Sequence, residues 1–239
     1  MAYPKHCHLC GRRLWGKSWL YGGDDVSADQ SIVVCRQCHE TAPRCDVCNR
    51  PMGEHAVQLP DRRRVCERCH RTAVYDQDHA RQIFDQVVHV VTASLGLDLH
   101  VGADFTLVDA QHLQRLAQEA DIGSADDPTH IVGLFVRRGR RRVMYALSGL
   151  PPAVLIQTIA HEWAHAWQGE NCPLLRDPLT REGFAEWAAY KTIQALGKES
   201  HLALMERQNG LYGAGLKAML KLERRAGLDG VLDFCRRAE

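Results

Sequence analysis

The chain has 239 residues, of which 45% are hydrophobic and 25% charged, and its formal net charge at pH 7 is +1. This composition is sufficient for a hydrophobic core and indicates a soluble globular protein of one large or two small domains. No run of about 18 apolar residues is present, and the amino terminus lacks the basic and then apolar pattern of a signal peptide. We therefore expect a cytoplasmic protein without a membrane partner, in which ten cysteines do not form a disulfide framework.

Eight of the ten cysteines form four CxxC pairs in the first 74 residues. Two thiolates separated by two residues form a knuckle around a tetrahedral ion, and a second knuckle completes a closed structural zinc site. The pattern CHLC with VVCRQCHETAP recurs as CDVC with RVCERCHRTAV, so we expect one zinc ion in each repeat. The predicted ligands are Cys7, Cys10, Cys35 and Cys38 for the first ion and Cys45, Cys48, Cys66 and Cys69 for the second.

Two consecutive zinc fingers of four ligands each resemble a LIM domain. Here Cys35 stands where a LIM domain usually has a histidine, and the linker HETAPR between the fingers is longer than usual. These departures bear on the packing of the fingers more than on the zinc sites. His39 and His70 directly follow ligand cysteines and are alternative ligands, although exposed or supporting histidines are the preferred interpretation. We therefore predict a LIM-like module with two structural zinc sites over residues 1–74.

Charge bears on the partner of this module. Residues 1–74 contain 12 Lys and Arg against 8 Asp and Glu, which is a mild positive surplus. Domains that follow nucleic-acid phosphates usually concentrate more charge on one face. We therefore favour a zinc-stabilised unit that packs on its neighbour or recruits a protein partner over a nucleic-acid-binding module.

After residue 74 the cysteine pairs stop and helical periodicity begins. One apolar helix face is predicted by the spacing of Ile83, Val87, Val90 and Val91. A strand over DFTLVDA, a helix over AQHLQRLAQEA, and two strands over HIVGLFV and RRVMYAL follow. With the long helices further along the chain, this order predicts an α+β domain over residues 75–239.

The stretch PPAVLIQTIAHEWAHAWQG predicts a long helix that begins at its prolines. At about 100° per residue, His161 and His165 lie about 40° apart around this helix, and Glu162 lies about 60° beyond His165. Trp163 and Trp167 point to the opposite side, where they can be buried. One helix face is therefore suited to bind a metal ion.

Two imidazoles leave a catalytic zinc ion short of a protein ligand, so we expect a third donor on another element. The helix predicted after Asp177 and Pro178 carries Glu182 in its first turns. The segment between His165 and Glu182 is long enough for the chain to turn and return. Two His and one Glu leave a position for water, as in thermolysin-type sites, and predict a zincin-like metallopeptidase domain.

Peptide hydrolysis at such a site needs a general base and a donor to the oxyanion. Glu162 is the expected base. Tyr212 is the first candidate for the donor, with Tyr190 and His201 as weaker candidates. Glu186, one turn beyond the third ligand, either orients a ligand or faces solvent.

Two cysteines, Cys172 and Cys235, belong to no CxxC pair. Cys172 lies between the two predicted metal-binding helices, where it is a candidate zinc ligand in a latent state. A free, partly buried thiol is the preferred interpretation.

With these motifs in order, the chain resembles the LIM-containing peptidases of the plant DA-one (big-organ) family, the ubiquitin-activated regulators of organ and seed size. The resemblance covers TLVDAQHLQRLAQEA, SGLPPAVLIQTIAHEWAHAW, EGFAEW and YGAGLKAMLKLERRAGLDGVLDFCRR. It implies zinc ligands at His161, His165 and Glu182 and a catalytic glutamate at Glu162. EGFAEW also looks like the third-ligand motif of gluzincin aminopeptidases, and both resemblances favour Glu182 over Glu186. The expected cofactors are one catalytic and two structural zinc ions, and the expected partner is a protein or peptide substrate.

Two other functions share some of these motifs. A non-enzymatic adaptor that binds protein through its zinc fingers predicts two zinc ions only. An SprT-like DNA-associated protease also joins a zinc module to HExxH, but that class places the module after the peptidase and uses a third histidine. The sequence therefore favours a metallopeptidase and leaves its substrate and its choice between endopeptidase and aminopeptidase open.

Overall fold

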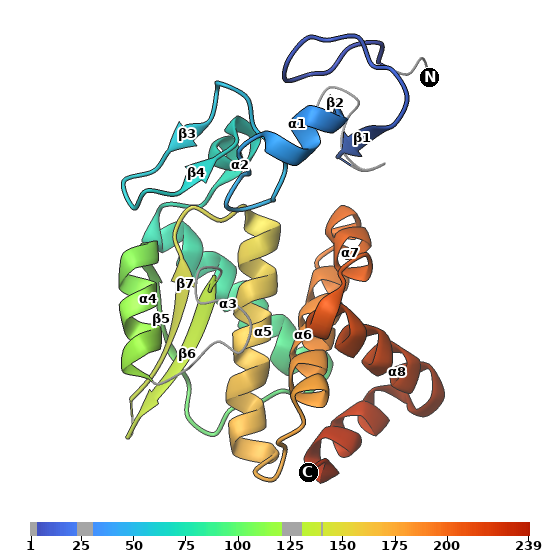
Figure 1. The fold of residues 1–239 in the computed structure, drawn as a ribbon. Helices are drawn as coiled ribbons and strands as arrows, with labels where there is room; N and C mark the ends of the chain where they lie inside the picture. Colours follow the sequence, from blue (N-terminus) through green and yellow to red (C-terminus); the bar gives the residue numbers. More distant parts are fainter. Residues whose placement is uncertain (1–3, 23–30, 121–130, 140) are drawn as a thin grey trace. The chain divides into compact units, whose positions relative to one another are not determined.

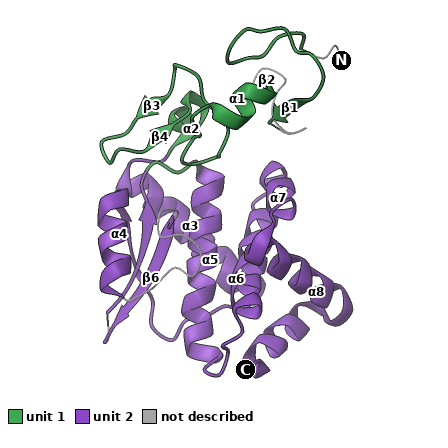
Figure 2. Cartoon of the chain, viewed as in Figure 1, with its two compact units in different colours: residues 1–73, 149–151 green, residues 74–148, 152–239 purple. Residues whose placement is uncertain are grey.

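The computed structural model describes residues 4–22, 31–120, 131–139 and 141–239. It is a mixed α+β protein with small sheets, as predicted, and it divides into two compact units (Figure 2). The first unit comprises residues 1–73 and 149–151, and the second comprises residues 74–148 and 152–239. Within the described ranges, no helix combines the length and apolar character needed to cross a membrane.

The first unit contains two copies of one small motif. Each copy is a two-stranded antiparallel sheet followed by a short helix, so the sequence repeat is also a structural repeat (Figure 1). The elements are β1 (Ser18–Tyr21), β2 (Ile32–Cys35) and α1 (Arg36–Thr41) in the first copy and β3 (Val57–Gln58), β4 (Arg64–Val65) and α2 (Glu67–Thr72) in the second.

A tight turn at the first CxxC pair opens each copy. The N–H of Gly11 donates to the carbonyl of Cys7 at 2.9 Å, and the N–H of Asn49 donates to that of Cys45 at 2.8 Å. Gly11 and Asn49 have φ angles of 68° and 55°, in the left-handed region that glycine and asparagine tolerate best. The turn folds each pair back on itself, so both thiols face the same point.

A cluster around His39 links the two copies. The His39 ring stacks on Trp19 with centroids 4.2 Å apart, and its Nδ1 lies 2.6 Å from the hydroxyl of Tyr21. Arg44, at the start of the second copy, donates to the Tyr21 hydroxyl at 2.9 Å and to the carbonyl of His39 at 2.5 Å. His39 is thus a packing residue and lies outside the thiol clusters.

The second unit is built on a three-stranded sheet in the order β5-β7-β6. β5 (Asp104–Val108) runs parallel to β7 (Arg141–Leu147), and β6 (Gly133–Arg138) pairs antiparallel with β7. β6 is therefore an edge strand of the sheet that the described strands form.

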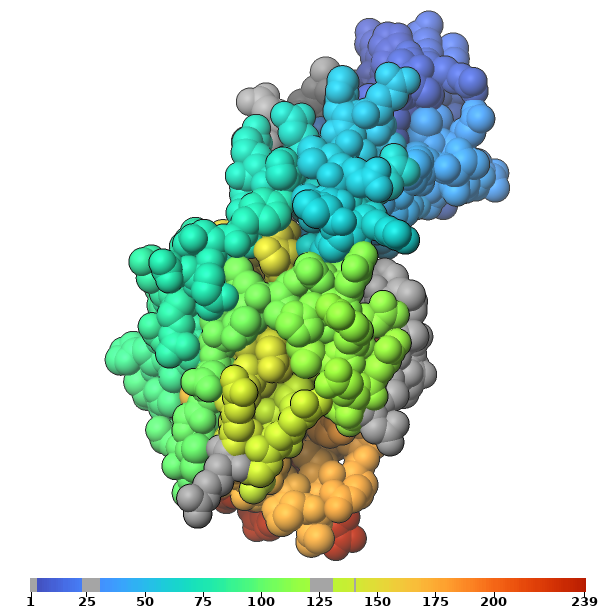
Figure 3. Space-filling view, turned by 90° about the vertical axis from the view of Figure 1, so that its left-hand side faces the viewer, coloured from blue at the N-terminus to red at the C-terminus, as the bar shows by residue number. Residues whose placement is uncertain are grey.

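Helices cover both faces of this sheet. α4 (Ala110–Glu119) lies on one face, and α3 (Gln77–Leu95) and α5 (Pro152–Asn171) lie on the other (Figure 1). Figure 3 views the α4 side, where the green atoms of α4 cover part of the yellow-green strands. Trp163 and Trp167 of α5 are buried as predicted, and the Trp163 indole donates to the carbonyl of Leu97 at 2.7 Å. This burial fixes the rotation of α5 about its axis.

A second helical layer continues from α5. Its elements are α6 (Pro178–Ala195), α7 (Glu199–Glu206) and α8 (Gly210–Arg237). α6 packs against both α5 and α8. Asp177 caps α6 by accepting a hydrogen bond from the N–H of Thr180 at 2.9 Å, so α6 begins where the sequence predicts. α8 is kinked at Gly227, which has φ 73° and ψ −178°.

Candidate metal centres

The predicted cysteines form two compact clusters in the first unit. In each cluster the four sulfur atoms lie within 4.8 Å of one another. The Cys10 and Cys35 sulfurs are 3.8 Å apart, and so are those of Cys48 and Cys66. Sulfurs bound to tetrahedral zinc at about 2.3 Å are about 3.8 Å apart, so both clusters fit a structural zinc ion.

Backbone N–H groups donate a hydrogen bond to one cysteine sulfur in each cluster. Cys7 Sγ accepts from the N–H of Cys35 at 3.4 Å, and Cys45 Sγ accepts from that of Cys66 at 3.3 Å. Burial acts to raise the pKa of Cys7, but hydrogen bonds from the backbone, with those of Cys10 and Cys35 the largest, lower it to about 6. The Cys7 thiolate is thus favoured at neutral pH, whereas burial and the neighbouring thiols raise the pKa of Cys38, which would lose its proton on binding zinc.

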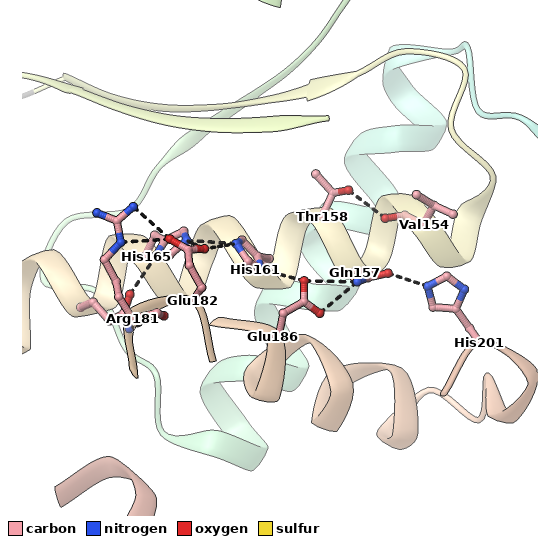
Figure 4. Close-up of polar contacts among 10 residues, drawn as sticks. Val154, Gln157, Thr158, His161, His165, Arg181, Glu182, Glu186 and His201 are labelled. Carbon is pink, nitrogen blue, oxygen red and sulfur yellow. Dashed lines mark hydrogen bonds and ion pairs between the residues drawn. The ribbon is translucent and has the colours of Figure 1, made fainter. Parts of the chain in front are cut away.

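A third donor cluster joins α5 to α6. The Nε2 atoms of His161 and His165 are 3.0 Å apart, and they lie 3.3 and 3.2 Å from Oε2 of Glu182 (Figure 4). Nitrogen and oxygen ligands of tetrahedral zinc, bound at about 2.0–2.1 Å, are about 3.3 Å apart. Arg181 donates to the other carboxylate oxygen of Glu182 at 3.1 Å. The structure therefore brings together the three residues that the sequence proposes, with one Glu182 oxygen directed to the imidazoles.

The surroundings of this cluster favour positive charge. Burial acts to raise the pKa of Glu182, but the hydrogen bonds to His161 and His165 outweigh it and hold the pKa far below its usual range. Burial likewise acts to lower the pKa of His161, yet Glu182 and Glu186, with a smaller contribution from Glu162, raise it to about 10. The carboxylates around the imidazoles thus outnumber the positively charged side chains there, and a bound divalent cation would balance their negative charge.

Glu186 supports His161 from the next turn of α6. This buried carboxylate lies 3.3 Å from Nδ1 of His161, which is within ion-pair range although the two groups are not aligned for a hydrogen bond. Gln157 donates to Glu186 at 3.0 Å, and the Gln157 carbonyl oxygen lies 2.7 Å from Nε2 of His201 (Figure 4). Of the two alternatives for Glu186, the structure places it against a candidate ligand and away from solvent.

Gln168 supports the other histidine and was not singled out by the sequence. Its side-chain oxygen lies 2.8 Å from Nδ1 of His165, and its amide donates to the carbonyl of Arg181 at 3.0 Å. Because Arg181 precedes Glu182 in the chain, Gln168 connects candidate ligands on both helices. The available signal was its position three residues after His165, on the same helix face.

Glu162 and Tyr212 flank the cluster on different elements. Glu162 faces β6, since a Cβ atom at Gly133 would lie 3.1 Å from its Oε1. The Tyr212 ring, 45% exposed, has its centroid 5.9 Å from that of His161. Tyr190 instead donates its hydroxyl to a carboxylate of α7. Of the three oxyanion candidates, the structure places Tyr212 against a candidate ligand.

Comparisons of the chain with family models, curated proteins and solved structures give no match.

Proposed function

We propose that the chain is a zinc-dependent metallopeptidase that hydrolyses peptide bonds in protein or peptide substrates. The proposal is carried by the convergence of His161, His165 and Glu182 at the spacing of tetrahedral zinc ligands. Three protein ligands leave one position open, whereas a structural site is closed by four. A zinc ion bound there would polarise the scissile carbonyl and lower the pKa of a water molecule towards about 7.

Glu162 acts as the general base in this proposal. It neighbours the first ligand on α5 but is not part of the donor cluster. Its carboxylate takes a proton from the attacking water and delivers it to the leaving nitrogen. The orientation of Glu162 towards Gly133 supports a substrate that runs along β6, where an extended peptide can add its backbone to the edge of the sheet that the described strands form.

Tyr212 completes the proposed site. Its exposure and its contact with the His161 ring support a role as hydrogen-bond donor to the oxyanion that develops at the scissile carbonyl. The two thiolate clusters act as structural zinc sites, and their module is available to recruit a protein partner.

The test separates catalysis from metal binding. Zinc content and cleavage of casein are measured for the wild type, Glu162→Gln, His161→Ala and Glu199→Gln, an exposed control on α7. We expect three zinc ions per chain in the wild type, Glu162→Gln and the control, and two in His161→Ala. Because glutamine cannot take a proton, Glu162→Gln should cleave about 10²- to 10⁴-fold more slowly.

Two outcomes contradict the proposal. A wild-type content of two zinc ions, unchanged by His161→Ala, would favour the adaptor function. Full cleavage by zinc-loaded Glu162→Gln would rule out the assigned base.

A further inference from the structure

Cys172 and Cys235 face each other outside the three donor clusters. Their sulfur atoms are 3.4 Å apart, and their residues are only 4% and 0% exposed. Cys172 directly follows α5, whereas Cys235 lies in the last turn of α8, 63 positions later. Cys172 is absent from the third donor cluster and contacts Cys235 instead. The structure therefore favours a buried thiol over the alternative of a latent zinc ligand.

The two thiols are electrostatically unequal. The hydrogen bond with Cys235 lowers the pKa of Cys172, and the nearby charge of Arg236 lowers it further. Contact with Cys172 raises the pKa of Cys235, and burial adds to that rise. The directions of these two pKa shifts favour ionisation of Cys172 over that of Cys235.

We propose that Cys172 and Cys235 form an oxidisable dithiol that hydrogen peroxide converts into an intramolecular disulfide. The Cys172 thiolate attacks one peroxide oxygen, so a sulfur–oxygen bond forms, the oxygen–oxygen bond breaks, and hydroxide leaves and is protonated to water. The Cys235 sulfur then attacks the Cys172 sulfur, and the oxygen leaves as a second water. Two thiols are thereby oxidised while one peroxide is reduced to two waters.

The bridge would tie α5 to the end of α8 across the helices between them. The closed loop contains α6, α7 and most of α8, and with them Glu182 on α6 and Tyr212 on α8. Gln168 lies at the border of the two sites, because its amide is 3.8 Å from the Cys235 sulfur while its oxygen contacts His165. Closing so long a loop restricts the unfolded chain and stabilises the folded unit. The inference concerns the thiols alone and does not depend on peptidase activity.

Peptide mapping tests the bond directly. The full-length, zinc-loaded protein is treated with hydrogen peroxide, alkylated and digested with trypsin without reduction. Cleavage after Arg142, Arg176, Arg225 and Arg236 places the two thiols on peptides 143–176 and 226–236, which contain none of the finger cysteines. We expect these peptides to appear as one cross-linked species lighter by two hydrogens than their sum, and to separate after reduction.

Thermal unfolding tests the consequence. The melting temperature of the oxidised protein should rise by about 5 °C or more and return to its starting value after reduction with dithiothreitol. Cys172→Ala and Cys235→Ala should each abolish both the cross-link and the shift. Recovery of the two peptides unlinked, cross-links to finger cysteines only, or a cross-link without a shift in the wild type would overturn the proposal.

Discussion

Each candidate histidine ligand has a different supporting group on its second ring nitrogen. His161 faces the carboxylate of Glu186, whereas His165 faces the neutral amide of Gln168. A carboxylate both orients an imidazole and increases its basicity, while an amide only orients it. We therefore expect charge removal at Glu186 to weaken metal binding without disturbing the packing around it.

Glu186→Gln tests this difference. The variant keeps the volume of the buried side chain but loses its charge, so zinc affinity at the third site should fall about 10- to 100-fold. A competition titration with a chelator measures that affinity, and Glu199→Gln is the matched surface control. Zinc in the two thiolate clusters should be unaffected. An unchanged affinity at the third site would show that Glu186 does not support the ligand.

At the scale of elements, the position of the candidate ligand Glu182 depends on the close approach of α6 and α8. The two helices cross at Gly183, next to Glu182 on α6, and at Gly215 on α8. A Cβ atom at Gly215 would lie 2.5 Å from the Gly183 Cα. Real Cβ atoms essentially never make so short a contact, and the three nearest obstructing atoms, from Gly183 and Leu179, all belong to the backbone. The two helices can therefore accept a side chain here only by moving apart.

Gly215→Ala should consequently destabilise the protein by about 1–3 kcal/mol and reduce zinc affinity at the third site, because α6 carries Glu182. Gly169→Ala is the control, since a Cβ atom at that exposed helical position meets no atom within 4 Å. It should be neutral or stabilise the protein by up to about 1 kcal/mol. Denaturant unfolding measures both values. Equal effects of the two substitutions would mean that the helices adjust freely at the crossing.

The elements also show which features a sequence can predict. The cap at Asp177 and the buried faces of Trp163 and Trp167 follow from local patterns, and the structure has them as predicted. The kink at Gly227 and the hydrogen bond from Gln168 to the distant Arg181 could not be predicted. A single glycine or glutamine within a helical pattern does not reveal which distant helix approaches it.

At the scale of the whole molecule, the two units have very different cores. The second finger buries few apolar side chains besides its cysteines, among them Met52, Leu59 and Val65. The second unit buries large residues such as Trp167 and Trp187 in contact with Phe184. A core as small as that of the finger does not supply enough stability alone, so the first unit should depend on its metal ions.

Cys45→Ser tests this dependence. Serine removes one thiolate of a four-ligand cluster, and structural zinc contributes about 10 kcal/mol or more to the folding of small zinc fingers. The zinc content should therefore fall by one ion per chain, and amide hydrogen exchange should accelerate in the second finger. Residues 178–195 of α6 should keep their protection, because the second unit retains its own core.

Cys172→Ser provides the control for Cys45→Ser, since Cys172 is a buried thiol outside every donor cluster. Its zinc content should equal that of the wild type. Hydrogen exchange and elemental analysis of the same samples then separate the loss of a ligand from the general effect of placing a hydroxyl at a buried cysteine. If Cys45→Ser kept its full zinc content and its finger remained protected, the four-cysteine site would be wrong. If α6 lost protection together with the finger, the two units would share their stability, and zinc bound by the thiolates would then be needed for the third site as well.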